Sequence, residues 1–162
     1  MTRLTDSLIR TTYRVAYGIA RCLWFVTRPK TTGALVAVWH DGRLLVIRNS
    51  YKSITTLPGG FVHRGESPGR AAARELAEEV GIVVSPDRLT YRGHHTGIVD
   101  FKRDTVHFFE VTMASEPVVA IDNREVVWGE FLTPPRLDTL PMSKQLRAYL
   151  EDRLTDPTAS VE

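Results

Sequence analysis

The spacing of hydrophobic residues changes along the chain, and each change predicts a different element. Residues 4–26 contain no proline and place apolar side chains at helical intervals, which is typical of an amphipathic helix. Two apolar runs follow at 34–39 and 43–48, and the Asp41-Gly42 pair between them favours a tight turn. We therefore expect a long helix, then a β-hairpin, and then a polar loop over 49–56.

The middle of the chain predicts a second helix, over residues 68–80. Ser67 is suited to cap its N-terminus, and Pro68 to its first position, where a missing N–H costs nothing. Gly81 can adopt the left-handed conformation that ends a helix. A short strand at 61–62 is expected to lead into this helix.

The remaining segments predict strands and a terminal helix. Alternating apolar residues indicate strands over 89–96 and 105–113, and residues 125–131 indicate a loop that leads into a last strand. Residues 97–104 are expected to form a loop or hairpin connection that faces substrate or solvent. A C-terminal helix is predicted over 143–154, with Ser143 as its cap.

This order of elements predicts an α/β fold in which helices cover the faces of a mixed sheet. A length of 162 residues suits one domain with one substantial core. We expect an amphipathic basic helix over 1–30, a folded domain over 31–154 and a flexible polar tail over 155–162.

Charge is unevenly distributed along the chain. The formal net charge is only +2, but residues 1–30 contain six basic residues and one acidic residue, so the rest of the chain is net acidic. The basic character belongs to the first helix, and we do not expect nucleic acid as a partner. Cys22 is the single cysteine, which excludes an intramolecular disulfide and permits the reducing cytoplasm, where we expect the protein.

The first helix has an arginine edge, formed by Arg3, Arg10, Arg14 and Arg21, opposite an apolar side. The arginines interrupt every apolar run long enough for a signal peptide or a membrane span. Three interpretations stay open. The helix packs on the domain or on a second subunit; it lies on the inner, anionic membrane surface with Trp24 and Phe25 at the interface; or it is disordered.

Three glutamates, Glu75, Glu78 and Glu79, fall close together on the predicted helix over 68–80. Like charges at this spacing destabilise a helix, whereas a hard divalent cation such as Mg²⁺ takes oxygen ligands and would reverse the repulsion. The alternative is an acidic, solvated helix face that Arg70 and Arg74 partly neutralise.

The segment from Gly60 to Ile82 resembles the signature of the Nudix hydrolases, the MutT-like enzymes. All nine specified positions of that signature are filled, namely by Gly60, Glu66, Arg74, Glu75, Leu76, Glu78, Glu79, Gly81 and Ile82. The resemblance implies an αβα sandwich. It also implies Mg²⁺- or Mn²⁺-dependent hydrolysis of a diphosphate linkage in a small-molecule, nucleoside diphosphate-linked metabolite.

The resemblance also implies roles for individual residues. Glu75, Glu78 and Glu79 would be metal ligands together with the Gly60 carbonyl, and Glu66 would support the site or bind a further metal. Arg74 would orient a carboxylate, while Glu78 and Glu79 would also be catalytic. The family often places a functional glutamate about six residues before an aromatic residue of the last strand. Glu125 and Phe131 have this spacing, so Glu125, and less so Glu130, is a candidate metal ligand or general base.

No subfamily can be assigned, because the residues that mark ADP-sugar and diadenosine polyphosphate hydrolases are absent at 97–100. Nucleoside triphosphates, nucleotide sugars and lipid-linked or isoprenoid diphosphates at a membrane surface stay open as substrates. Two other classes of function are also open: a non-catalytic module that binds a nucleotide or metabolite, and a peripheral membrane adaptor that uses the first helix.

Overall fold

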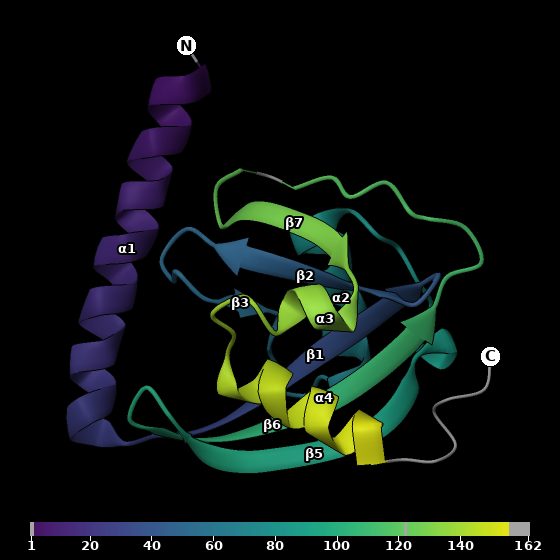
Figure 1. Ribbon diagram of the computed structural model, residues 1–162. Coiled ribbons are helices and arrows are strands. Elements are labelled where there is room, and N and C mark those ends of the chain that lie inside the picture. The colour runs from purple at the N-terminus through teal and green to yellow at the C-terminus, as the bar shows by residue number, and fades with distance from the viewer. Residues whose placement is uncertain (1, 122, 156–162) are drawn as a thin grey trace.

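The structure is a computed structural model that describes residues 2–121 and 123–155 (Figure 1). Its helices and strands are, in chain order, α1 Thr2–Thr27, β1 Lys30–His40, β2 Arg43–Asn49, β3 Thr55–Thr56, β4 Gly59–Phe61, α2 Pro68–Val80, the 3-10 turn η1 Pro86–Arg88, β5 Thr90–Val99, β6 Lys102–Thr112, β7 Val126–Leu132, α3 Pro134–Leu137 and α4 Lys144–Thr155. Apart from Thr155, the tail expected at the C-terminus lies outside the described residues.

Within the described residues the strands form one mixed sheet, ordered β3-β2-β1-β6-β5, with β4 paired to β1 and β7 paired to β2. β1 and β6 run parallel at its centre, while the β1–β2 and β5–β6 pairs are antiparallel. Asp41 and Gly42 join β1 to β2 and have φ angles of 48° and 67°. Positive φ at both positions is what a type I′ hairpin turn needs, so the predicted hairpin is confirmed.

Helices cover both faces of the sheet, as an αβα sandwich requires. Alternate residues of β1 point to opposite faces, so Val36 and Val38 pack in the core beneath α2. Ala37 and Trp39 belong to a second core, which includes Leu146 of α4. In Figure 1, α2 lies behind the sheet and α4 in front of it.

A buried carboxylate, Glu110 of β6, fastens α4 to the sheet. Tyr149 of α4 donates a hydrogen bond to Glu110 at 2.6 Å, and Arg153 of the same helix forms an ion pair with it. Burial raises the pKa of Glu110, but hydrogen bonds from Arg153 and Tyr149 outweigh this effect and hold the pKa below its usual value.

The connection expected over residues 97–104 is shorter than predicted. β5 continues to Val99 and β6 starts at Lys102, so the turn consists of Asp100 and Phe101, which have φ angles of 48° and 68°. Lys102 and Asp104 are buried although they are charged. Charged residues are more typical of a loop than of a buried strand. Both side chains line a cavity, however, and this position is compatible with a strand.

The first helix, α1, packs along one edge of the domain through its arginine edge (Figure 1). Arg10 donates to the Asn123 carbonyl at 2.7 Å, and Arg14 donates to the Ser50 carbonyl at 3.0 Å. Tyr17 donates to Asp100 at 2.7 Å. The apolar side of α1 consequently points away from the domain, whereas the side chain of Arg3 lies outside the described part. None of the helices in the described ranges has the length and hydrophobicity needed to span a membrane.

Candidate functional site

Local signals at both ends fix the position of α2. The Ser67 hydroxyl accepts a hydrogen bond from the Arg70 backbone N–H at 3.4 Å, and Pro68 occupies the first turn. Gly81 ends the helix with a φ of 71° and donates to the Ala77 carbonyl at 3.1 Å. Because both ends are defined, the glutamates of α2 face the loops on either side of β4.

The Arg74 guanidinium gathers three of the predicted carboxylates. It binds Glu66 through two hydrogen bonds of 3.0 and 3.1 Å, and its third nitrogen lies 2.8 Å from Glu75 and 3.2 Å from Glu78. It also donates to the Phe61 carbonyl at 3.1 Å, which ties α2 to β4. These contacts are compatible with the orienting role that the family resemblance implies for Arg74.

Glu66 is held in its charged form. Hydrogen bonds from Arg74, and then from the His63 backbone N–H, lower the pKa of Glu66 to about 2. The same contacts raise the pKa of Arg74 above its usual range, the hydrogen bond to Glu66 having the largest effect. This ion pair closes the loop that precedes α2.

Glu79 is buried, with only 6% of its surface exposed, so the alternative of an acidic, solvated face formed by all three helix glutamates is wrong. One of its oxygens accepts a hydrogen bond from the Gly59 N–H at 2.8 Å, and the other lies 3.5 Å from the Asn49 amide. Burial raises the pKa of Glu79 to about 8; the Gly59 hydrogen bond opposes this effect, while the Glu75 and Glu125 carboxylates add to it. Within the described residues Glu79 has no ion-pair partner.

Glu125 is a candidate because of its sequence spacing to Phe131, and its side chain lies in the same region as Glu79. The Tyr51 hydroxyl donates to Glu125 at 3.1 Å, and the Asn49 amide, which approaches Glu79, lies 3.4 Å from that hydroxyl. The Ser50 N–H also donates to the Glu125 carbonyl at 2.7 Å, which fixes the segment before β7. A connected polar group therefore links Glu125 to Glu79. Glu130, the weaker candidate, is exposed on β7.

Gly60 allows Glu75 to approach the backbone closely. A Cβ at this position would lie 2.5 Å from the Glu75 carboxylate, so any larger residue would displace that carboxylate. Across the described ranges, no three acidic, histidine or cysteine side chains are arranged so that together they could hold an ion, because Arg74 occupies the space among its partners. The donors are nonetheless all oxygen atoms, and Glu75, Glu79 and Glu125 bring negative charge to one place. This chemistry fits a hard divalent cation.

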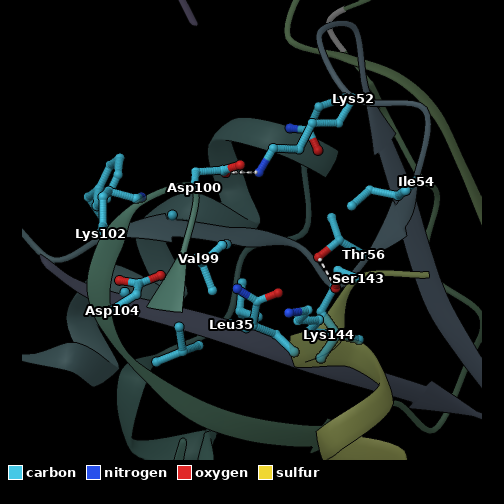
Figure 2. A pocket seen from close by; sticks show the side chains of 18 of the residues that line it. Leu35, Lys52, Ile54, Thr56, Val99, Asp100, Lys102, Asp104, Ser143 and Lys144 are labelled. Carbon is cyan, nitrogen blue, oxygen red and sulfur yellow. Dashed lines mark hydrogen bonds and ion pairs between the residues drawn. The ribbon is translucent and has the colours of Figure 1, made fainter. Parts of the chain in front are cut away.

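A cavity of about 470 Å³ opens beside these residues and is lined in part by Asn49, Tyr51, Gly59 and Gly60. Figure 2 shows Lys102 and Asp104 on one side of the view and Ile54 and Thr56 on the other. Ligand sites of 300–1,000 Å³ are typical for small molecules, so the volume suits a nucleotide-sized compound.

Cationic groups line the part of the cavity next to α1. Lys52 forms an ion pair with Asp100 at 3.0 Å, as Figure 2 shows. The Lys102 ammonium lies 4.3 Å from the centre of the Trp24 ring and 4.5 Å from that of Phe61. It is buried, forms no ion pair within 4.0 Å among the described residues, and has a lowered pKa, mainly because of burial. Lys102 can therefore offer its charge to an anionic ligand.

The sequence interpretation missed these cavity residues. Lys102 and Asp104 are spaced by two, which places both on one face of a strand. This alternation indicates a strand, although we expect residues 97–104 to form a connection. Tyr17 and Arg21 could not be found from sequence, because they reach the cavity only after α1 has packed on the domain.

Comparison with known proteins identifies related sequences. The family profile of the NUDIX domain matches residues 28–152. A MutT-like protein of Streptomyces ambofaciens is 46% identical over 66 residues, which are 40% of this chain and 43% of that protein. An ADP-ribose pyrophosphatase of Bacillus subtilis (strain 168) is 30% identical over 103 residues, which are 61% of this chain and 53% of that protein. The chain thus spans about half the length of these curated relatives.

Solved structures have the same fold. The crystal structure of a MutT NUDIX hydrolase from Burkholderia pseudomallei has a TM-score of 0.65 and 26% identity, covering 76% of this chain and 97% of that one. A bifunctional NMN adenylyltransferase/ADP ribose pyrophosphatase from Francisella tularensis, complexed with AMP and a manganese ion, has a TM-score of 0.69 and 18% identity. That match covers 88% of this chain and 47% of the other.

Proposed function

Because the chain belongs to the Nudix family, we propose that it is a pyrophosphohydrolase that cleaves the diphosphate linkage of a nucleoside diphosphate-linked metabolite. The observation that supports this most is the approach of Glu75 and Glu125 to the buried Glu79, which contacts Gly59 and Asn49 in the lining of a nucleotide-sized cavity. Every acidic position of the family signature is filled, which favours catalysis over a non-catalytic binding module.

The metal would be Mg²⁺ or Mn²⁺, held by Glu75, Glu78, Glu79 and the Gly60 carbonyl, with Glu66 as a supporting residue or a ligand of a further ion. All these donors are oxygen atoms, which both ions accept. The manganese ion in the Francisella tularensis structure supports this choice. Once bound, such an ion neutralises the diphosphate oxygens and makes a water molecule more acidic.

The chain's own residues would position the reacting groups. Arg74 holds Glu66 and Glu75 in fixed orientations, which limits the motion of the carboxylates before the metal enters. Glu125 would accept the proton of the attacking water, and the hydrogen bond from Tyr51 keeps this carboxylate directed toward Glu79. The bond between phosphorus and the bridging oxygen would break, and that oxygen would leave with the second phosphate.

The cavity would hold the remainder of the substrate. Its cations favour an anionic group, and Lys102 is well placed because it is buried in the lining and no carboxylate within 4.0 Å neutralises it in the described structure. The name of the Bacillus subtilis relative, an ADP-ribose pyrophosphatase, points to a nucleotide-linked diphosphate, so nucleotide sugars, together with nucleoside triphosphates, are the substrates we propose.

A substrate panel tests this proposal. ADP-ribose, a UDP-sugar, several nucleoside triphosphates and isoprenoid diphosphates would be incubated with the full chain and Mg²⁺, Mn²⁺ or a chelator, and the released phosphates and nucleotides separated by chromatography. We expect cleavage of at least one nucleotide-linked compound, abolished by the chelator. Tight nucleotide binding without cleavage under any metal would favour a binding module and overturn the proposal. Cleavage of the isoprenoid compounds alone would overturn the assigned substrate class.

A further inference from the structure

An uncharged stripe runs along the outer side of α1. We call the outer stripe the set formed by Leu8, Thr12, Val15, Ile19, Cys22, Leu23 and Val26, all of which are exposed. The five large aliphatic side chains among them are 57% to 79% exposed, although they belong to a regular helix that packs on the domain. Isolated exposed apolar residues need no explanation, but a continuous row of them indicates an interaction surface.

The spacing within the outer stripe is that of a helix-pairing seam. Leu8, Thr12, Val15, Ile19, Cys22 and Val26 follow one another at alternating steps of four and three residues. This is the heptad pattern with which one helix packs against another. The Thr12 hydroxyl donates to the Leu8 carbonyl at 3.1 Å, so its polar atom already has a partner within α1. The seam therefore suits the side chains of a second helix.

The charges of α1 favour a protein partner over a membrane surface. An interfacial membrane helix directs its basic residues toward anionic headgroups. Here Arg10 and Arg14 donate to backbone carbonyls of their own domain, and Arg21 lies 3.7 Å from Asp100. Between Asp6 and Thr27, the half of the helix surface that is centred on the outer stripe carries no charged residue.

The exposed area is close to what a small dimer interface needs. At about 100 Å² for each large aliphatic side chain, with smaller additions from Thr12 and Cys22, the outer stripe offers on the order of 600 Å² per copy, or about 1,200 Å² for two copies, which is the lower limit of a stable interface. The helix extends over about 39 Å, because each of its 26 residues adds about 1.5 Å. A second α1 has the same length and the same complementary seam.

We propose that α1 pairs through the outer stripe with α1 of a second copy of this chain, forming a two-fold homodimer. Such a symmetric contact uses the same surface on both copies, as most soluble dimers do. The outer stripe does not overlap the cavity lining, to which α1 contributes Tyr17 and Arg21 from its other side. Each copy would therefore keep its own complete cavity.

Sedimentation equilibrium of the full chain, between about 1 and 100 μM, tests this pairing. We expect a species of twice 18.3 kDa, and monomers over the same range for the double variant Val15→Glu/Ile19→Glu, because two charges per copy would lie in the seam. The control is Val118→Glu, at a valine in the loop between β6 and β7 that is more exposed than Val15 and Ile19 and lies outside the outer stripe; this variant should remain dimeric. Circular dichroism of each variant shows whether α1 is still helical.

Three results would overturn the homodimer. The first is a wild-type chain that sediments as a monomer at every concentration, and the second is a dimer that survives the double substitution in a folded chain. The third is a monomer that pellets with vesicles of phosphatidylcholine and phosphatidylglycerol while the double variant stays in solution, because the outer stripe would then bind lipid. None of these results would affect the proposed hydrolysis, since no outer-stripe residue lines the cavity.

Discussion

Replacing Glu79 with glutamine tests whether its negative charge, rather than its hydrogen bonds, is needed. The buried carboxylate accepts the Gly59 N–H at 2.8 Å, and a glutamine carbonyl oxygen of the same shape can accept that hydrogen bond. The variant therefore keeps its connection to β4 but cannot supply the negative charge that Glu79 would give to a bound cation beside Glu75 and Glu125.

The expected magnitudes for Glu79→Gln differ between stability and turnover. Because the Gly59 hydrogen bond is retained, the free energy of unfolding in chelator should change by no more than about 1 kcal/mol. Turnover should fall by about two orders of magnitude, or about 2.7 kcal/mol in the barrier, since one electrostatic stabiliser of the reaction is removed. The stabilisation that Mg²⁺ gives to the folded chain should shrink as well.

Turnover would be measured on the best compound of the substrate panel over a range of Mg²⁺ concentrations, and stability by thermal unfolding with Mg²⁺ or chelator. Glu130→Gln, an exposed glutamate on β7, is the matched control and should behave like the wild type. Near-normal turnover in Glu79→Gln, together with an unchanged response of Tm to Mg²⁺, would remove Glu79 from the proposed metal site.

Two further substitutions test stability. Arg74→Met should lower the free energy of unfolding in chelator by about 1–2 kcal/mol, since Glu66 loses two charge-assisted hydrogen bonds. The control Arg70→Met, at an exposed arginine, should change that free energy by less than about 0.5 kcal/mol, and urea titration measures both variants. Glu110→Gln tests pH dependence: because the folded-state pKa of Glu110 is depressed, its contribution is complete above the unfolded value of 4.5 and is lost as the pH falls through the folded pKa. The stability difference between wild type and Glu110→Gln should therefore narrow from pH 7 toward pH 3, and a constant difference would contradict the Arg153 ion pair.

Features set by neighbouring residues were predictable from the sequence. The Asp41-Gly42 turn, the Ser67 cap and the Gly81 terminus depend on backbone preferences of a few residues, and all three are confirmed. The Ser143 cap is confirmed too, since its hydroxyl accepts the Leu146 N–H at 3.1 Å. These local signals fix element order and type, and hence the α/β architecture.

Burial of charged residues was not predictable, because it depends on strands that are distant in sequence. Glu79 lies on the acidic side of its helix, and only the packing of β4 and the approach of Asn49 from β2 exclude water from it. Lys102 falls in the segment expected to form a connection, whereas it lies on a strand, between the rings of Trp24 and Phe61. In both cases the surroundings come from segments at least 20 residues away.

The packing of α1 shows why an amphipathic pattern does not by itself decide which side faces the domain. Burial of an apolar stripe is the usual outcome, but it needs an apolar surface to receive it. This edge of the domain offers instead the carbonyls of Ser50 and Asn123 and the carboxylate of Asp100, which are hydrogen-bond acceptors, and only two aromatic rings, Tyr51 and Phe101, contact aromatic side chains of α1 in the described structure. Arginine and tyrosine donors satisfy such acceptors, so the polar edge of α1 turns inward. Because the polar edge faces the domain, the apolar side of α1 faces solvent. Only a partner from outside the domain could cover it.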